Sequence, residues 1–70
     1  MEHVVHLSKE IYPMEEINHV VKEYQKLTHI RVIDREQYWD CIFYACMYDE
    51  EQTAAEFENY LIDRMNLNVL

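Results

Sequence analysis

The sequence contains no glycine at all, and this absence excludes several kinds of site. Glycine-rich phosphate loops need it to bring the backbone close to the ligand, and a nucleophile elbow needs a backbone φ above zero. A tight two-residue hairpin of the primed type depends on glycine or asparagine as well. Because residues 34–37 contain neither, a longer turn is expected there.

Basic residues are scarce, with 6 lysines and arginines against 14 aspartates and glutamates and a formal charge of −8. Nucleic acids and anionic lipids attract proteins chiefly through lysine and arginine, so both are disfavoured as partners. A basic partner, or a basic patch on one, would be steered toward such a chain. Solubility is the simpler reason for the same charge, and both explanations stay open.

Long apolar runs are also missing. The chain opens with an acid at Glu2, no apolar run of signal-peptide length follows, and no stretch approaches the ~20 residues of a membrane span. The two cysteines, Cys41 and Cys46, lie five positions apart in one expected strand. An odd spacing sends them to opposite faces, which makes a disulfide geometrically poor. We therefore expect reduced thiols and a cytoplasmic protein.

The residues that are present are sufficient for a folded core. Half of them are hydrophobic and 13% are aromatic, which is more apolar surface than a disordered chain carries. A length of 70 residues accommodates one domain. We expect a single α+β domain over residues 1–70.

Two helices are expected from apolar periodicity and from their starting residues. Pro13 suits a first helical turn, and an apolar stripe at helical spacing follows it. Asp49 with Gln52 three residues later is a variant of the capping box, which predicts a second helix. The two stripes contain Ile17, Val20, Val21, Tyr24 and Leu27 in the first helix, and Ala54, Phe57, Leu61 and Met65 in the second.

Three strands complete the expected order β-α-β-β-α, over residues 2–7, 28–33 and 38–48. The third is the longest and most apolar, which favours a central position. The strands would then form a three-stranded mixed sheet in the order 1-3-2. Both helices are expected to cover one face of this sheet, which leaves the other face open.

The open face can be assigned from the alternation of side chains. The third strand divides into a set containing Trp39 and Phe43 and a set containing Asp40, and an unpaired carboxylate is costly to bury under helices. The Asp40 set is therefore placed on the open face, and Cys46 with it. We define the open face as Val4, His6, Arg31, Ile33, Tyr38, Asp40, Ile42 and Tyr44. Exposed tyrosines among aliphatic side chains are typical of protein interfaces.

No catalytic, cofactor-binding or metal-ligating set is recognised. His3 and His6 are three apart in a strand, so they point to opposite faces, and the Cys-x4-Cys spacing does not suit zinc on a strand. Neither cysteine nor Ser8 has a recognisable base beside it. We expect no enzyme, no cofactor and no metal.

Two segments carry a resemblance to a known family. Residues 11–17, Ile-Tyr-Pro-Met-Glu-Glu-Ile, resemble that family's Tyr-Ser-Leu-Glu-Ala-Ile helix opening, and residues 57–64, Phe-Glu-Asn-Tyr-Leu-Ile-Asp-Arg, resemble its closing helix. The family is that of the His-Xaa-Ser system protein D, small proteins found with radical-SAM peptide-modifying enzymes. Its usual Leu-Arg-Glu ending is replaced here by Met-Asn-Leu at residues 65–67. The resemblance implies an accessory role in peptide maturation, such as presenting the substrate to the enzyme.

The functional expectation is thus a non-catalytic domain that binds another protein or a peptide. The open face is the expected site, with Tyr38, Asp40, Ile42, Tyr44, Arg31 and Ile33 as its contact residues. An edge strand is a second possible docking mode. The alternative is a structural homodimer that uses the same face.

Overall fold

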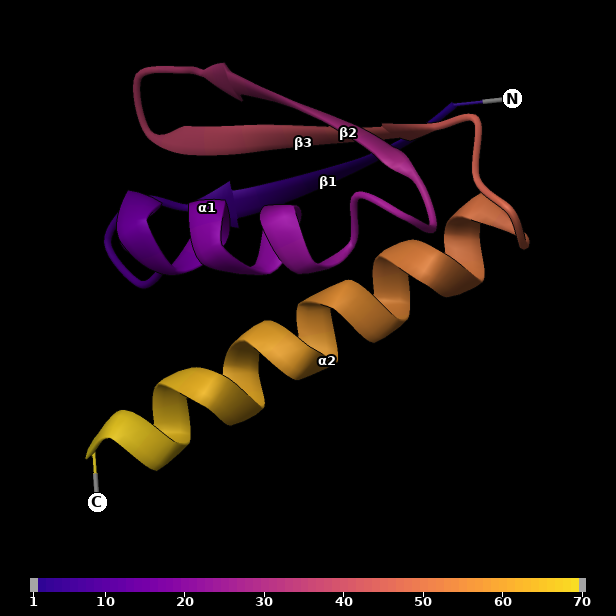
Figure 1. Ribbon diagram of the computed structural model, residues 1–70. Helices are drawn as coiled ribbons and strands as arrows, with labels where there is room; N and C mark the ends of the chain where they lie inside the picture. The colour runs from indigo at the N-terminus through magenta and orange to yellow at the C-terminus, as the bar shows by residue number, and fades with distance from the viewer. Residues whose placement is uncertain (1, 70) are drawn as a thin grey trace.

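The computed structural model describes residues 2–69, and it confirms the expected order β-α-β-β-α (Figure 1). Each element begins within a residue or two of its predicted start. The elements are β1 (His3–Ser8), α1 (Met14–Glu23), β2 (His29–Asp34), β3 (Tyr38–Tyr44) and α2 (Glu50–Val69).

The sheet has the predicted order, with β3 between β1 and β2. Both hydrogen-bonded pairs are antiparallel, so the sheet is antiparallel and the expectation of a mixed sheet was wrong in this respect. Since β1 and β2 are each antiparallel to β3, they run in the same direction, but they are not neighbours. Two strands that run in the same direction need a connection that brings the chain back to the end of the sheet where it started, and the helix between β1 and β2 is part of that connection.

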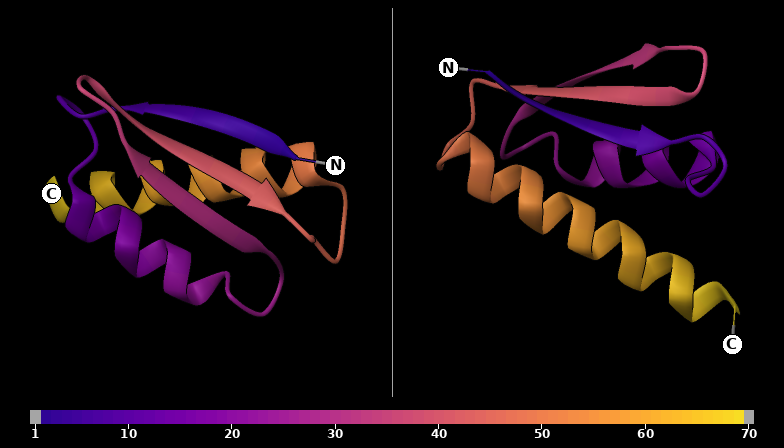
Figure 2. Two further views of the ribbon diagram at one scale, coloured as in Figure 1. Left: turned by 90° about the horizontal axis from the view of Figure 1, so that it is seen from above. Right: turned by 180° about the vertical axis from the view of Figure 1, so that it is seen from behind.

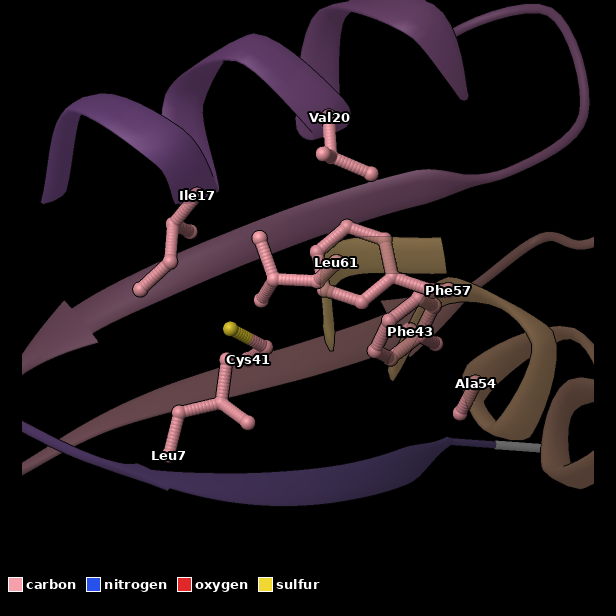
Figure 3. Packing of buried hydrophobic residues seen from close by; sticks show 8 residues of the cluster. All are labelled: Leu7, Ile17, Val20, Cys41, Phe43, Ala54, Phe57 and Leu61. Carbon is pink, nitrogen blue, oxygen red and sulfur yellow. The ribbon is translucent and has the colours of Figure 1, made fainter. Parts of the chain in front are cut away.

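Both helices lie on the same side of the sheet, as predicted (Figures 1 and 2). The core sits between the layers, where side chains from β1, β3 and both helices meet (Figure 3). The rings of Phe43 and Phe57 touch edge to face, with centroids 5.1 Å apart. Burying one such side chain stabilises the fold by about 1.5–3 kcal/mol. The buried cluster comprises Leu7, Ile17, Val20, Cys41, Phe43, Ala54, Phe57 and Leu61.

The helix starts follow the predicted chemistry. Pro13 directly precedes α1 in an extended conformation, and Glu15 and Glu16 lie in the first turn, where negative charge favours the helix dipole. At α2, the Asp49 carboxylate accepts the backbone N–H of Gln52 at 2.9 Å. This bond is the N-cap that the sequence predicted. Within residues 2–69, neither helix combines the length and apolar character needed to cross a membrane.

The third strand ends earlier than predicted, at Tyr44 instead of residue 48. Ala45 has a φ of 51°, in the left-handed region, and this turns the chain out of the strand. Two residues later, the Met47 N–H donates to the Leu27 carbonyl at 2.8 Å. The alternation therefore stops at Tyr44.

This turn corrects the placement of Cys46. It was assigned to the open face, but it packs against the core, with its Sγ 2.8 Å from the Thr28 hydroxyl. Both cysteines consequently lie on the helix side of the sheet, although both are free, as expected. The argument from odd spacing was wrong because it assumed an unbroken strand.

Candidate functional site

The six predicted contact residues all lie on the sheet face away from the helices. Along β3, Trp39, Cys41 and Phe43 enter the core, so Tyr38, Asp40, Ile42 and Tyr44 point the other way. The strand register places Arg31 opposite Ile42, and Ile33 opposite Asp40. It places Val4 and His6 opposite the same two β3 residues from the other side. The open face therefore has the composition that alternation predicted.

The open face does not expose its members equally. Tyr38 is 46% exposed, Tyr44 39% and Val4 42%, which makes them the large hydrophobic side chains of this face available to a partner. Ile42 is only 8% exposed, although no helix covers it. It lies in the middle of the sheet, between Val4 and Arg31. Ile42 thus packs against its neighbours on the open face and has little surface available for contact with a partner.

A charged cluster occupies one end of the open face. The Asp40 carboxylate lies 2.5 Å from His6 Nδ1 and accepts a hydrogen bond from Arg35 Nε at 3.1 Å. The bond from His6 is the main reason that the pKa of Asp40 falls below its usual range, and the Arg35 guanidinium lowers it further. A carboxylate accepts but does not donate, so Nδ1 is the protonated nitrogen of His6 in this pair.

These residues line a shallow depression of about 440 Å³ together with Tyr38. The Tyr38 ring meets the His6 ring edge to face, with centroids 6.4 Å apart. At the other end of β3, Tyr44 stacks on His29 with ring planes 20° apart. Two tyrosines, each in contact with a histidine ring, therefore flank the centre of the open face.

No protein-family model, curated protein or solved structure matches the chain. The site is therefore interpreted from its own geometry.

The sequence analysis missed one contributor to the open face, Arg35, and the exposure of Met47 in the connection after β3. Arg35 was assigned to the loop between β2 and β3, yet it continues the alternation of His29, Arg31 and Ile33 by one more step of two residues. Extending that alternation past the strand would have found it. Met47, 68% exposed, was placed inside a strand, and only the turn at Ala45 brings it to the surface.

The four histidines have separate environments. His3 lies opposite Phe43 on the core face, whereas His6 lies on the open face, as their spacing predicted. His19 pairs with Glu23 at 2.8 Å one helical turn away, and His29 stacks on a tyrosine. Within residues 2–69, no three histidine, cysteine or acidic side chains gather closely enough to hold a metal ion.

The two cysteines differ in exposure. Cys41 is fully buried, and burial raises the pKa of its thiol to about 12. Since the thiolate is the nucleophile, a thiol with this pKa is unreactive near neutral pH. Cys46 is only partly covered and contacts the Thr28 hydroxyl.

Proposed function

We propose that this chain is a small non-catalytic domain that binds another protein or a peptide on its open face. The supporting observation is that Val4, Tyr38 and Tyr44 are each about two-fifths exposed on a sheet face that no helix covers. Tyrosine provides rigid contact area while its hydroxyl remains hydrated. This combination suits a surface that faces water in the free protein and contacts a partner in the complex.

Each tyrosine of the open face already contacts a histidine ring without any partner. His29 stacks on Tyr44, and His6 contacts the edge of Tyr38. Ordering a free side chain at an interface costs about 0.5–1.5 kcal/mol. Rings already in contact with neighbours avoid part of that loss, so this arrangement favours binding.

The chemistry of the reactive side chains supports a non-catalytic role. The depression on the open face is lined by His6, Arg35, Tyr38 and Asp40, a set without a serine, threonine or cysteine nucleophile. Here Asp40 serves as a shared acceptor for its two basic neighbours. Such a cluster connects side chains of the surface through hydrogen bonds, and this structural role requires no substrate.

The resemblance at residues 11–17 and 57–64 gives this proposal a biological setting. An accessory protein of a peptide-modifying enzyme would bind either the enzyme or its peptide. Free thiols at Cys41 and Cys46 are in keeping with the cytoplasmic location that we propose.

The proposal is tested by Tyr44→Arg, which places a long cation at one end of the expected contact. Tyr48→Arg is the matched control, because Tyr48 is 65% exposed but lies in the connection after β3, outside the open face. We expect the first variant to lose association with its partner in a pull-down from the source cell, and the second to retain it. Equal retention by both folded variants would refute the assignment of the open face.

A homodimer is the second candidate, because two copies could pack their open faces together. A standard interface buries about 800 Å² per partner, roughly a sixth of the 5052 Å² surface of this chain. Light scattering over a concentration series separates the candidates. A mass that doubles with concentration in the wild type, but not in Tyr44→Arg, would favour the homodimer, whereas a monomer at all concentrations would exclude it.

A further inference from the structure

Charge is distributed unevenly between the two layers of the fold. Asp40 is the one carboxylate of the open face, and His6 and Arg35 already bind it. Most other acids lie on the helical layer or at its start. They are Glu15, Glu16, Glu23, Asp49, Glu50, Glu51, Glu56, Glu58 and Asp63. Most of the negative charge therefore lies on the helical side, and the four remaining acids are Glu2, Glu10, Asp34 and Glu36.

The cations of the open face follow one edge strand. His29, Arg31 and Ile33 alternate along β2 on the open face, and Arg35 continues the series just after the strand. Arg31 is exposed and has no ion pair among residues 2–69. Arg35 donates to Asp40 only through Nε, and its side chain is 60% exposed. Two guanidinium groups four positions apart are thus available at this edge.

The outer edge of β2 has no partner strand within the described residues, since the sheet ends there. Figure 2 shows α1 lying along the same edge on the helix side. A hollow of about 340 Å³ lies between the end of this helix and the strand, lined by Val21, Gln25, Thr28, His29 and Ile30. A strand added at this edge could therefore pair with free backbone N–H and C=O groups of β2, and the hollow would lie on its helix side.

We propose that the β2 edge binds an extended acidic segment of a partner protein as a fourth strand. Two carboxylates four residues apart in that segment would face Arg31 and Arg35, with an apolar side chain between them on Ile33. Directly opposed cross-strand side chains of opposite charge attract, whichever way the added strand runs. This inference rests on the proposed function and specifies the chemistry of the partner.

The acidic helical layer does not prevent this contact. The molecule is 17 Å deep along its shortest axis, and charges are screened over about 8 Å at physiological ionic strength. Carboxylates that reach the β2 edge are therefore influenced mainly by charges on β2 and its turn, where Arg31 and Arg35 lie beside Asp34, which is itself paired with Lys9. The total charge suggested that a basic partner would be attracted to the chain. Such a partner would be attracted to the helical side of the molecule, opposite the open face.

The test uses the full chain and two labelled peptides whose binding is followed by fluorescence anisotropy. One peptide alternates threonine and valine and carries glutamates four positions apart, and the other carries lysines in their place. We expect only the acidic peptide to bind, and Arg31→Glu to weaken it about three- to ten-fold. Binding of the lysine peptide alone, or of neither peptide, would overturn the inference.

Lys22→Glu is the charge-matched control, because Lys22 is exposed on α1 and is neither part of β2 nor among the residues that line the hollow. We expect Lys22→Glu to bind the acidic peptide with an affinity within about two-fold of the wild type. That result would show that net charge alone has little effect on binding. Circular dichroism checks that each variant is folded. An equal loss of affinity in both variants would assign the effect to total charge and contradict the β2 site. The β2 site would also be contradicted if a single-stranded oligonucleotide bound to the chain and lost affinity to the same extent in Arg31→Glu.

Hydrogen exchange locates the added strand, since strand addition protects backbone amides at the edge that receives it. We expect the peptide to slow exchange in β2 and leave β1 unchanged, whereas protection confined to β1 would refute the choice of edge. With the natural partner, loss of binding in Tyr44→Arg but not in Arg31→Glu would reject only the acidic strand. Full binding by both variants would reject the proposed function as well.

Discussion

Replacing Ala45 by glycine should stabilise this protein, although the chain otherwise contains no glycine. Ala45 is the one non-glycine residue with a positive φ among the described residues, and its value is 51°. Its side chain is exposed, so Ala45→Gly removes no core packing. The substitution therefore tests the backbone conformation that ends β3 and turns Cys46 toward the core.

Two opposing effects set the size of the change. A left-handed conformation costs an L-residue with a β-carbon about 1–2 kcal/mol, which glycine avoids. Glycine loses about 0.5–1 kcal/mol more conformational entropy on folding than alanine does. The first effect is the larger, so we expect the free energy of unfolding to rise by about 0.5–1 kcal/mol. In a domain of this size, that corresponds to a rise in Tm of roughly 2–8 °C.

Urea unfolding followed by the fluorescence of Trp39 measures this difference, and Ala55→Gly is the matched control. Ala55 is also exposed, but it lies inside α2, where glycine should lower the free energy of unfolding by about 1 kcal/mol. The two substitutions thus have opposite expected signs. If Ala45→Gly destabilised the protein as much as Ala55→Gly does, the account of the turn at Ala45 would be wrong.

Three further predictions concern the core, the charged cluster and the thiols. Phe57→Ala removes a fully buried ring and should cost about 3–5 kcal/mol, enough to unfold most of so small a domain, as circular dichroism would show; a native spectrum would contradict this. The pKa of Asp40 is lowered by folding, so its pairing stabilises the protein above the ordinary aspartate pKa of about 3.9 and ceases to do so as the pH falls through the lower folded value. The difference in unfolding free energy between wild type and Asp40→Asn should therefore shrink between pH 6 and pH 2.5, and a constant difference would refute the pairing. A thiol reagent at pH 8 should leave Cys41 unmodified until the protein is unfolded, because burial raises its pKa to about 12; modification of two thiols per folded chain would contradict that.

Much of the fold could be predicted because local and global signals agree in this chain. The apolar run from Tyr38 to Tyr44 combines strand-forming residues with enough hydrophobicity for a central position, and β3 occupies that position. Asp49 and Gln52 predicted the start of α2 because their capping bond is local. Alternation divided β3 into two faces, and the cost of burying the Asp40 carboxylate under the helices identified which of them is open.

The remaining features depend on contacts that the sequence does not display. Alanine has no preference for a left-handed conformation, so nothing at Ala45 signals the end of β3, and Cys46 was placed on the wrong face in consequence. The bond from Arg35 to Asp40 requires knowledge of how the chain turns between β2 and β3. The burial of Ile42 results from neighbours on two other strands.

The most direct test of a binding role for the open face is site-specific photo-crosslinking. A photoreactive phenylalanine analogue at position 44 would report contact with a partner in the source cell, and the same analogue at position 48 is the control. The account predicts one discrete adduct from position 44, absent when Tyr38→Arg is added to the same chain, and no such adduct from position 48. Equal adducts from both positions, or an adduct from position 48 alone, would contradict it.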